Sequence, residues 1–338
     1  MRFEQVSVYG VSHVDAEHRV TSTELEAQLE ATMQRLGIPR GILQGLTGIE
    51  ARRMWDGSYP PSQAATAAGE LAIERAGVSR ERIGVLINTS VCRDYIEPST
   101  ASLVHRNLDL APHCINFDLG NACLGFLSAM EIVGNMIERG QVEFGLVVDG
   151  ENSRQVVTET IKRLRDPEID QDTFRANFAT LTLGSGGAAM VLGRNDLAPN
   201  GHRFVGSVTT AATEHADLCR GQVDRMETKT KELLVEGIAL AKRTWEAAKV
   251  ELGWRPGSLD EYVLHQVSKS HTEKLAGALE LEPLKILTTY GELGNVGPAA
   301  VPIVLSKAVE AGRIERGNRV GLLGIGSGLN CSMAEVVW

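Results

Sequence analysis

Residues 117–126, Phe-Asp-Leu-Gly-Asn-Ala-Cys-Leu-Gly-Phe, begin the stretch around which the rest of the chain is organised. The pattern predicts a short strand, a tight Gly-Asn turn and a helix from Cys123 to about Arg139. This helix is apolar on nearly every face, and its small residues allow close backbone approach, so we expect it to be buried. Gly140 follows the last turn, where glycine favours a helix end.

A cysteine at the start of a buried helix has chemical consequences. The free N–H groups and the positive end of the helix dipole favour a thiolate at Cys123. The same N–H groups can hold a developing oxyanion. The alternative is that Cys123 is only a small buried hydrophobic residue, as most free cysteines are.

Composition limits the possible functions. The chain has 338 residues, of which 43% are hydrophobic, which predicts a large globular protein of two domains or one duplicated domain. The net charge is −9 and no long run of like charge occurs, so nucleic acid is not an expected partner. No apolar stretch is long enough to span a membrane, and the N-terminus lacks a secretory signal pattern.

The five cysteines are widely spaced and odd in number, which argues against a disulfide framework and against a zinc site. We therefore expect no metal and a cytoplasmic location. The cysteines are Cys92, Cys114, Cys123, Cys219 and Cys331.

Strand and helix patterns alternate along the chain, which predicts an α/β fold with largely parallel sheets. Residues 153–180 form mixed helix and loop in this interpretation. The expected strands are 3–12, 83–90, 114–119, 144–150, 184–192, 262–265, 286–290, 319–323 and 332–337. The expected helices are 24–36, 62–76, 99–108, 123–139, 228–252, 270–279 and 298–311.

The two halves of the chain repeat each other. Leu119-Gly120-Asn121 matches Leu293-Gly294-Asn295, and the paired strands keep an offset of about 175 residues. We interpret this as a duplication, with one half at 1–195 and a second at 196–338. Equivalent loops of two such repeats converge, so Cys123 of the first half should meet His265 and Asn295 of the second.

The three side chains together suit acyl-thioester chemistry. A thiolate needs a hydrogen-bonding neighbour, and a thioester enolate needs neutral donors. The histidine and the asparagine also have structural explanations: His265 ends a buried strand, and Asn295 lies between glycines in a sequence typical of a turn.

A glycine-rich segment, 324–330, lies between two expected strands. It lacks the Lys-Ser/Thr ending of a phosphate loop, and no helix follows it. Close backbone approach would let an N–H near Ser327 join that of Cys123 in an oxyanion hole. An ordinary tight hairpin explains the segment equally well.

The motifs at 121–126, 264–266, 294–299 and 324–328 resemble the thiolase superfamily, and most of all its ketoacyl-synthase III branch. The resemblance covers essentially the whole chain. It implies a five-layered αβαβα fold built from two duplicated halves, an obligate homodimer and acyl-thioester condensation through Cys123.

At three positions this chain carries other residues than the synthases that initiate bacterial fatty-acid synthesis. Ser270 stands where those enzymes carry an arginine that helps dock acyl carrier protein. Ile42 and Leu46 stand where a tryptophan and an arginine commonly hold the coenzyme A head. The residues that bind the coenzyme A head are therefore left unassigned.

Within this branch, residues 93–102, 264–268 and the C-terminal segment are similar to the OleA family, which condenses acyl-CoA molecules head to head in long-chain olefin biosynthesis. The resemblance implies joining of two long-chain acyl-CoAs to a 2-alkyl-3-keto acid, with release of coenzyme A and no cofactor beyond the thioester substrates. It implies that Glu97 reaches across the dimer into the partner's site. Enzymes of a hydrocarbon pathway are the expected downstream partners.

A base at Glu97 makes chemical sense, because condensing two plain acyl chains requires removal of an unactivated α-proton. The alternative is that Glu97 caps the helix that follows Pro98. Three other functions compete: a decarboxylative 3-oxoacyl synthase III that uses malonyl thioester, a degradative thiolase and a non-catalytic acyl-binding subunit. The thiolase lacks support, since no second catalytic cysteine stands at the usual C-terminal motif: Cys331 lies beyond the glycine-rich turn, where the last strand begins.

Overall fold

The computed structural model describes all residues, 1–338, and its centre is one continuous sheet of nine strands. In spatial order the strands are β11 (Glu261–Leu264), β12 (Arg319–Gly326), β13 (Asn330–Val337), β8 (His202–Ala211), β1 (Val6–Asp15), β7 (Gly186–Arg194), β6 (Phe144–Glu151), β4 (Ile83–Asn88) and β5 (Ile115–Asp118).

This sheet consists of two similar sets of strands. The order β1-β7-β6-β4 in the first set matches β8-β13-β12-β11 in the second, and β5 extends the first set at its edge. The sets join through a short antiparallel pairing of Ser7 with Arg203 and Val8 with His202. The chain passes from one set to the other between Arg194 and His202.

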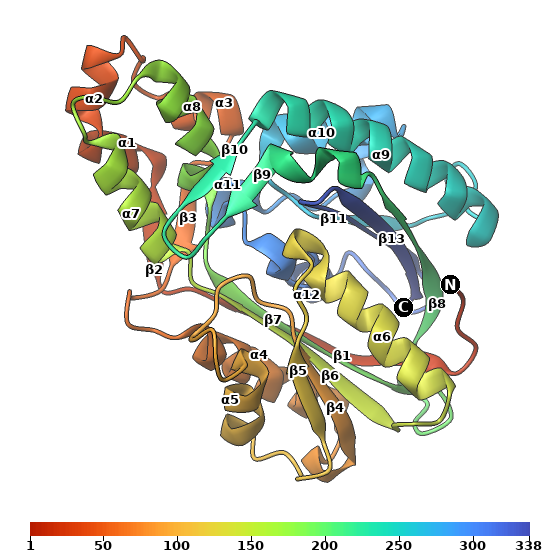
Figure 1. Cartoon of the computed structure of the whole chain (residues 1–338). Helices are drawn as coiled ribbons and strands as arrows, with labels where there is room; N and C mark the ends of the chain where they lie inside the picture. Colours follow the sequence, from red (N-terminus) through yellow and green to blue (C-terminus); the bar gives the residue numbers. More distant parts are fainter.

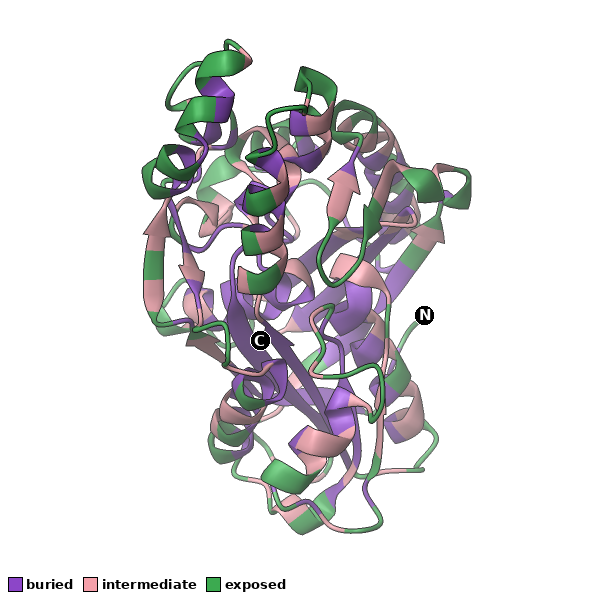
Figure 2. Cartoon of the chain, turned by 60° about the vertical axis from the view of Figure 1, so that its left-hand side comes forward, coloured by how far each residue is buried: buried purple, intermediate pink, exposed green.

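Helices cover both faces of each set, which gives the five layers that the family resemblance implies (Figure 1). The middle layer is α6 (Gly125–Glu138) and α12 (Ala300–Glu310), whose side chains share one core with strands of both sets. One outer layer is α4 (Pro61–Ala76) with α5 (Thr100–Asn107), and the other is α9 (Thr230–Glu251) with α10 (Lys269–Ala278). Figure 2 shows the buried residues gathered in the strands and on the inward faces of the helices.

A smaller group of elements forms its own core at one end of the molecule, around Leu25, Met33, Leu164 and Phe174 (Figure 1). The helices are α1 (Ser22–Gln28), α2 (Glu30–Arg35), α3 (Ile42–Thr47), α7 (Arg154–Leu164) and α8 (Gln171–Phe178). The strands beside them are β2 (His18–Thr21), β3 (Ala51–Met54), β9 (Cys219–Gly221) and β10 (Met226–Thr228). No helix of the structure combines the length and the apolar character that crossing a membrane requires.

Three sequence-based predictions of secondary structure were wrong. The sheet is not largely parallel: three neighbouring pairs of strands are parallel and five are antiparallel, because β7 and β13 run opposite to both of their neighbours and β1 runs opposite to β8. Residues 286–289 do not form a strand, because the side chain of Gln266 takes their hydrogen-bonding groups: its amide donates to the Leu287 carbonyl at 2.6 Å and accepts from the Thr289 N–H at 2.8 Å. The strand β8 was not predicted, although it joins the two sets of strands. A short α-helix, α11 (Tyr290–Leu293), follows the extended segment.

Candidate active site

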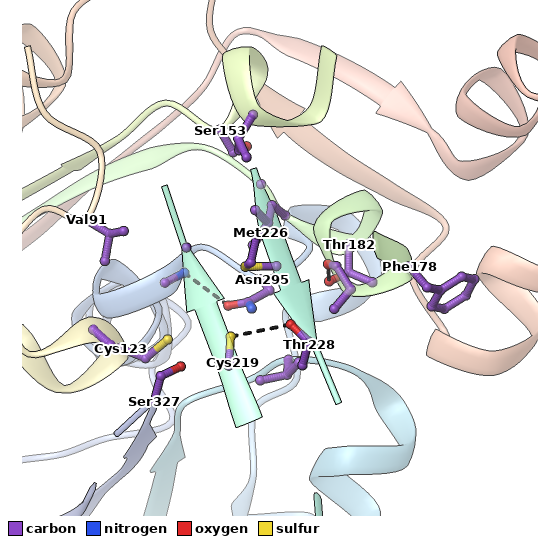
Figure 3. Close-up of a pocket in the computed structure, with 18 of the residues that line it drawn as sticks. Val91, Cys123, Ser153, Phe178, Thr182, Cys219, Met226, Thr228, Asn295 and Ser327 are labelled. Carbon is purple, nitrogen blue, oxygen red and sulfur yellow. Dashed lines mark hydrogen bonds between the residues drawn. The ribbon is translucent and has the colours of Figure 1, made fainter. Parts of the chain in front are cut away.

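A cavity of about 1960 Å³ lies between the two halves and the smaller group of helices. Cys123, His265, Asn295 and Ser327 all line it, so the structure brings these four predicted site residues together. Figure 3 shows Cys123 and Ser327 beside each other, with Asn295 and the strand of Cys219 facing them. Ligand pockets are commonly about 300–1,000 Å³, so this cavity has room for more than one acyl chain.

Cys123 lies in a tight turn of 3-10 helix at residues 122–124, and α6 begins two residues later. Ala122, directly before it, has a φ of 44°, a left-handed conformation that few non-glycine residues adopt. The Asn121 amide donates to the Ser128 hydroxyl at 2.9 Å and ties the turn to the helix.

Burial raises the pKa of the Cys123 thiol to about 12, and the nearby Cys219 and Glu151 add to the effect. Desolvation therefore outweighs the helix end, which we expected to favour a thiolate. A protonated Cys123 needs a neighbouring base before it can act as a nucleophile.

His265 directly follows β11, where its backbone N–H donates to the Leu323 carbonyl at 2.8 Å. Burial lowers the pKa of His265 to about 3, and the neighbouring His271 lowers it further, while the Asn295 amide opposes the shift. Neither ring nitrogen of His265 has a hydrogen-bond partner. The imidazole is therefore neutral, with one N–H and one acceptor nitrogen free for a ligand.

Asn295 is held in place by backbone groups on both sides. Its N–H donates to the Thr182 carbonyl at 2.9 Å, and its carbonyl accepts from Gly184 at 2.8 Å. The preceding Gly294 has a φ of 68°, and a Cβ there would lie 2.6 Å from the Thr182 carbonyl oxygen, so glycine is required.

The glycine-rich segment forms a tight hairpin and also approaches the nucleophile turn. Gly326 pairs with Asn330 across the hairpin. A Cβ on Gly326 would lie 3.2 Å from the Leu124 nitrogen and 3.3 Å from the Asn121 carbonyl oxygen. The segment is therefore a tight hairpin that also approaches the turn of Cys123, with Ser327 beside Cys123 (Figure 3). The role of its backbone N–H in an oxyanion hole stays a prediction.

Glu97 lies outside the cavity of its own chain. It is exposed, in the loop between β4 and α5, and it makes no hydrogen bond or ion pair within the chain. Ser99 caps α5 by accepting from the Ser102 N–H, and Asp118 accepts from the N–H groups of Thr100 and Ala101. The alternative that Glu97 caps this helix is therefore wrong.

Sequence reasoning missed three polar residues that line the cavity: Glu151, His271 and Cys219. Glu151 ends the apolar strand β6 and Cys219 begins the three-residue strand β9, and neither stands in a recognisable motif. His271 lies six residues after His265, in the first turn of α10, and the presence of a second histidine so near in the chain was the only available signal. Ile42, Leu46 and Ser270 also line the cavity wall.

Two family models match the chain. The model for 3-oxoacyl-[acyl-carrier-protein] synthase III matches residues 117–212, and the model for the C-terminal part of that enzyme matches residues 250–338. An acyl-CoA:acyl-CoA alkyltransferase of Xanthomonas campestris is 51% identical over 338 residues and all of both chains. One of Shewanella oneidensis is 35% identical over 351 residues, again covering both chains completely.

The chain belongs to the acyl-CoA:acyl-CoA alkyltransferase family, also called OleA. A solved structure of a cysteine variant of Xanthomonas campestris OleA has a TM-score of 0.98 at 50% identity and covers 100% of this chain and 98% of its own. Another cysteine variant, with bound lauric acid and lauroyl-CoA, has a TM-score of 0.97 and covers 99% of this chain and all of its own. A β-ketoacyl synthase III of Rhodospirillum centenum is only 26% identical, over 86% of this chain and 88% of its own.

Proposed function

We propose that this chain joins two long-chain fatty acyl-CoA molecules head to head by a non-decarboxylative Claisen condensation and yields a 2-alkyl-3-keto acid. The observation that carries the proposal is one large cavity in which a cysteine, a neutral histidine and an asparagine converge. The OleA structure with lauric acid and lauroyl-CoA supports fatty acyl thioesters as the substrate class.

The first step is acylation of Cys123. The thiol attacks the thioester carbonyl while His265, neutral and free of partners, takes the thiol proton. The carbonyl oxygen becomes an oxyanion, for which the backbone N–H groups of Cys123 and Ser327 are the proposed donors. Collapse of this intermediate expels coenzyme A, which leaves as a thiol after it receives the proton.

The second step forms the carbon–carbon bond. Glu97 of the partner subunit removes the α-proton of a second acyl-CoA, and the His265 N–H and the Asn295 amide hold the enolate oxygen. The enolate carbon attacks the acyl-enzyme carbonyl and displaces the Cys123 sulfur. Water then hydrolyses the β-ketoacyl thioester to the keto acid and coenzyme A.

Two observations support Glu97 as the base in a homodimer. It is exposed and unpaired in its own chain, on a loop whose tip residues Tyr95 and Ile96 are 60% and 94% exposed. The solved Xanthomonas variants replace a glutamate, a cysteine and a histidine separated by 26 and 142 residues. Glu97, Cys123 and His265 have the same separations.

The proposed setting is a cytoplasmic homodimer in the biosynthesis of olefins and other long-chain hydrocarbons. The β-keto acid is a reactive product, so downstream enzymes of that pathway are the expected partners. No cofactor is required, because the thioester substrates supply the activation.

Product analysis tests the proposal against decarboxylative synthase III chemistry. Purified protein receives lauroyl-CoA alone, without a malonyl donor. We expect a β-keto acid, or its decarboxylated ketone, in which both acyl chains are joined, with two molecules of coenzyme A released for each. A strict requirement for malonyl thioester would overturn the proposal.

A further inference from the structure

The loop that carries Glu97 is fixed to the rest of the chain at several points. Asp94 accepts from the Ser62 N–H at 3.0 Å and from the Ser62 hydroxyl at 2.6 Å, at the start of α4. Residues 95–97 at the tip of the loop make no such contact and are exposed, and Tyr95 and Ile96 also line the cavity of their own chain. Small changes at the anchors would therefore displace the tip.

Glu151 anchors the beginning of this loop. It is the last residue of β6 and only 4% exposed. One carboxyl oxygen accepts from the Val91 N–H at 2.6 Å, and the other accepts from the Cys92 N–H at 3.1 Å. No cation pairs with Glu151, so the Cys92 side chain and these two backbone N–H groups compensate for burying the group.

The same carboxyl group also borders the cavity of its own chain. A Cβ placed on Gly297 would lie 3.7 Å from the Glu151 carboxyl carbon, and Gly297 belongs to the turn of Asn295. Glu151 could in principle act there as a base. A base in its own cavity and a residue that positions the Glu97 loop differ in one respect: the subunit in which condensation fails when Glu151 is lost.

We propose that Glu151 is a positioning residue that holds the Glu97 loop for catalysis in the partner's active site. The inference rests on the proposed function, because it needs Glu97 to act across the dimer. Its distinctive consequence is that the loss of Glu151 should damage condensation in the neighbouring subunit while leaving acylation of Cys123 intact.

Step-resolved kinetics give the first test. Glu151→Ala and Glu151→Gln are compared with Glu138→Gln, a matched control whose carboxylate accepts from the consecutive N–H groups of Glu4 and Gln5 at the far end of α6. We expect both Glu151 variants to acylate Cys123 at least as fast as the parent, because loss of the Glu151 charge removes one cause of the raised pKa of the Cys123 thiol. Condensation should fall roughly ten- to hundredfold in Glu151→Ala and less in Glu151→Gln, whose amide oxygen still accepts one N–H. Condensation at the parent rate, an equal loss of acylation, or failure of both variants to fold would overturn the proposal.

Mixed dimers locate the defect. A Cys123→Ala subunit paired with a Glu151→Ala subunit has one nucleophile, and the Glu97 that serves it lies on the subunit with an intact Glu151. This dimer should condense at half the parent rate. A wild-type subunit paired with a Cys123→Ala/Glu151→Ala subunit also has one nucleophile, but the Glu97 that serves it lies on the subunit without Glu151, so this dimer should condense at half the rate of the Glu151→Ala homodimer. The reverse pattern would assign Glu151 to its own cavity instead.

Glu97→Ala is measured in the same series to separate the two proposals. If Glu97→Ala stops condensation while both Glu151 variants condense normally, only the role of Glu151 is wrong. If Glu97→Ala condenses at the parent rate, the proposed base is wrong and the positioning role of Glu151 fails with it.

Discussion

The backbone N–H of Gly297 donates a 3.1 Å hydrogen bond to the side-chain oxygen of Asn295. This bond fixes the orientation of the amide, so its NH₂ group is the part left to donate into the cavity. Asn295→Asp keeps the acceptor for Gly297 but replaces the donor with a carboxylate oxygen that repels an enolate. We expect condensation to fall by about 10²-fold, the usual effect of losing one oxyanion donor.

Stopped-flow release of coenzyme A and product formation separate the two steps in this variant. Asn318→Asp is the matched control, because the Asn318 side chain also accepts from a backbone N–H, that of Glu315, but in a surface turn. A variant Asn295→Asp with undiminished condensation would show that the amide has no catalytic role.

Cys123→Ser should fold, form no acyl adduct at position 123 and lose condensation. Serine has the same shape, but its hydroxyl is a much weaker nucleophile than a thiol assisted by His265. Intact-protein mass spectrometry after incubation with lauroyl-CoA measures the adduct. Cys219→Ser tests the other thiol of the cavity and should still become acylated. If the adduct is lost in Cys219→Ser but not in Cys123→Ser, Cys219 is the nucleophile.

Glu97→Gln should acylate normally and fail to condense, because the amide cannot accept the α-proton. Mixing it with Cys123→Ser should restore condensation, since one subunit of each mixed dimer supplies Cys123 and the other supplies Glu97. The measurement is product formation after co-expression of two differently tagged chains. No gain over either parent variant would contradict action across the dimer.

The sequence was sufficient for the parts of the site that follow from duplication and local motifs. The repeated Leu-Gly-Asn turns and the matched strands placed Cys123 opposite His265 and Asn295, and the glycines at 324–328 indicated the close approach at Gly326. Burial was harder to foresee. The helix start at Cys123 suggested a thiolate, yet the depth of the cavity decides the pKa, and depth depends on elements far away in the chain.

The sequence also could not predict which side chains take the place of a backbone group as hydrogen-bond partner. Gln266 occupies the hydrogen-bonding groups that would have made residues 286–289 a strand. Glu151 holds a loop about 60 residues away in the chain through two backbone N–H groups, and nothing in its local sequence marks that role.

The two buried histidines predict a loss of stability in mild acid. Burial lowers the pKa of His265 to about 3 and that of His271 to about 4, from an ordinary value of 6.5. Above pH 6.5 both rings are neutral in the folded and unfolded chains, so their contribution is constant. Below that pH the unfolded chain binds protons that the folded chain does not, and stability falls until the folded pKa is reached.

His271→Gln should therefore reduce the acid sensitivity. Between pH 7.5 and 5.5 each buried histidine costs about 1.4 kcal/mol of the free energy of unfolding, and the variant should recover that amount relative to the parent. Burial raises the pKa of Glu151 to about 7, so this group stabilises the folded chain as the pH falls. Glu151 is present in both proteins, so its contribution to the free energy of unfolding cancels in the comparison. Urea unfolding at the two pH values measures the difference, with His113→Gln as the exposed control. An equal pH dependence in His271→Gln and the parent would mean that His271 is not held neutral by the fold.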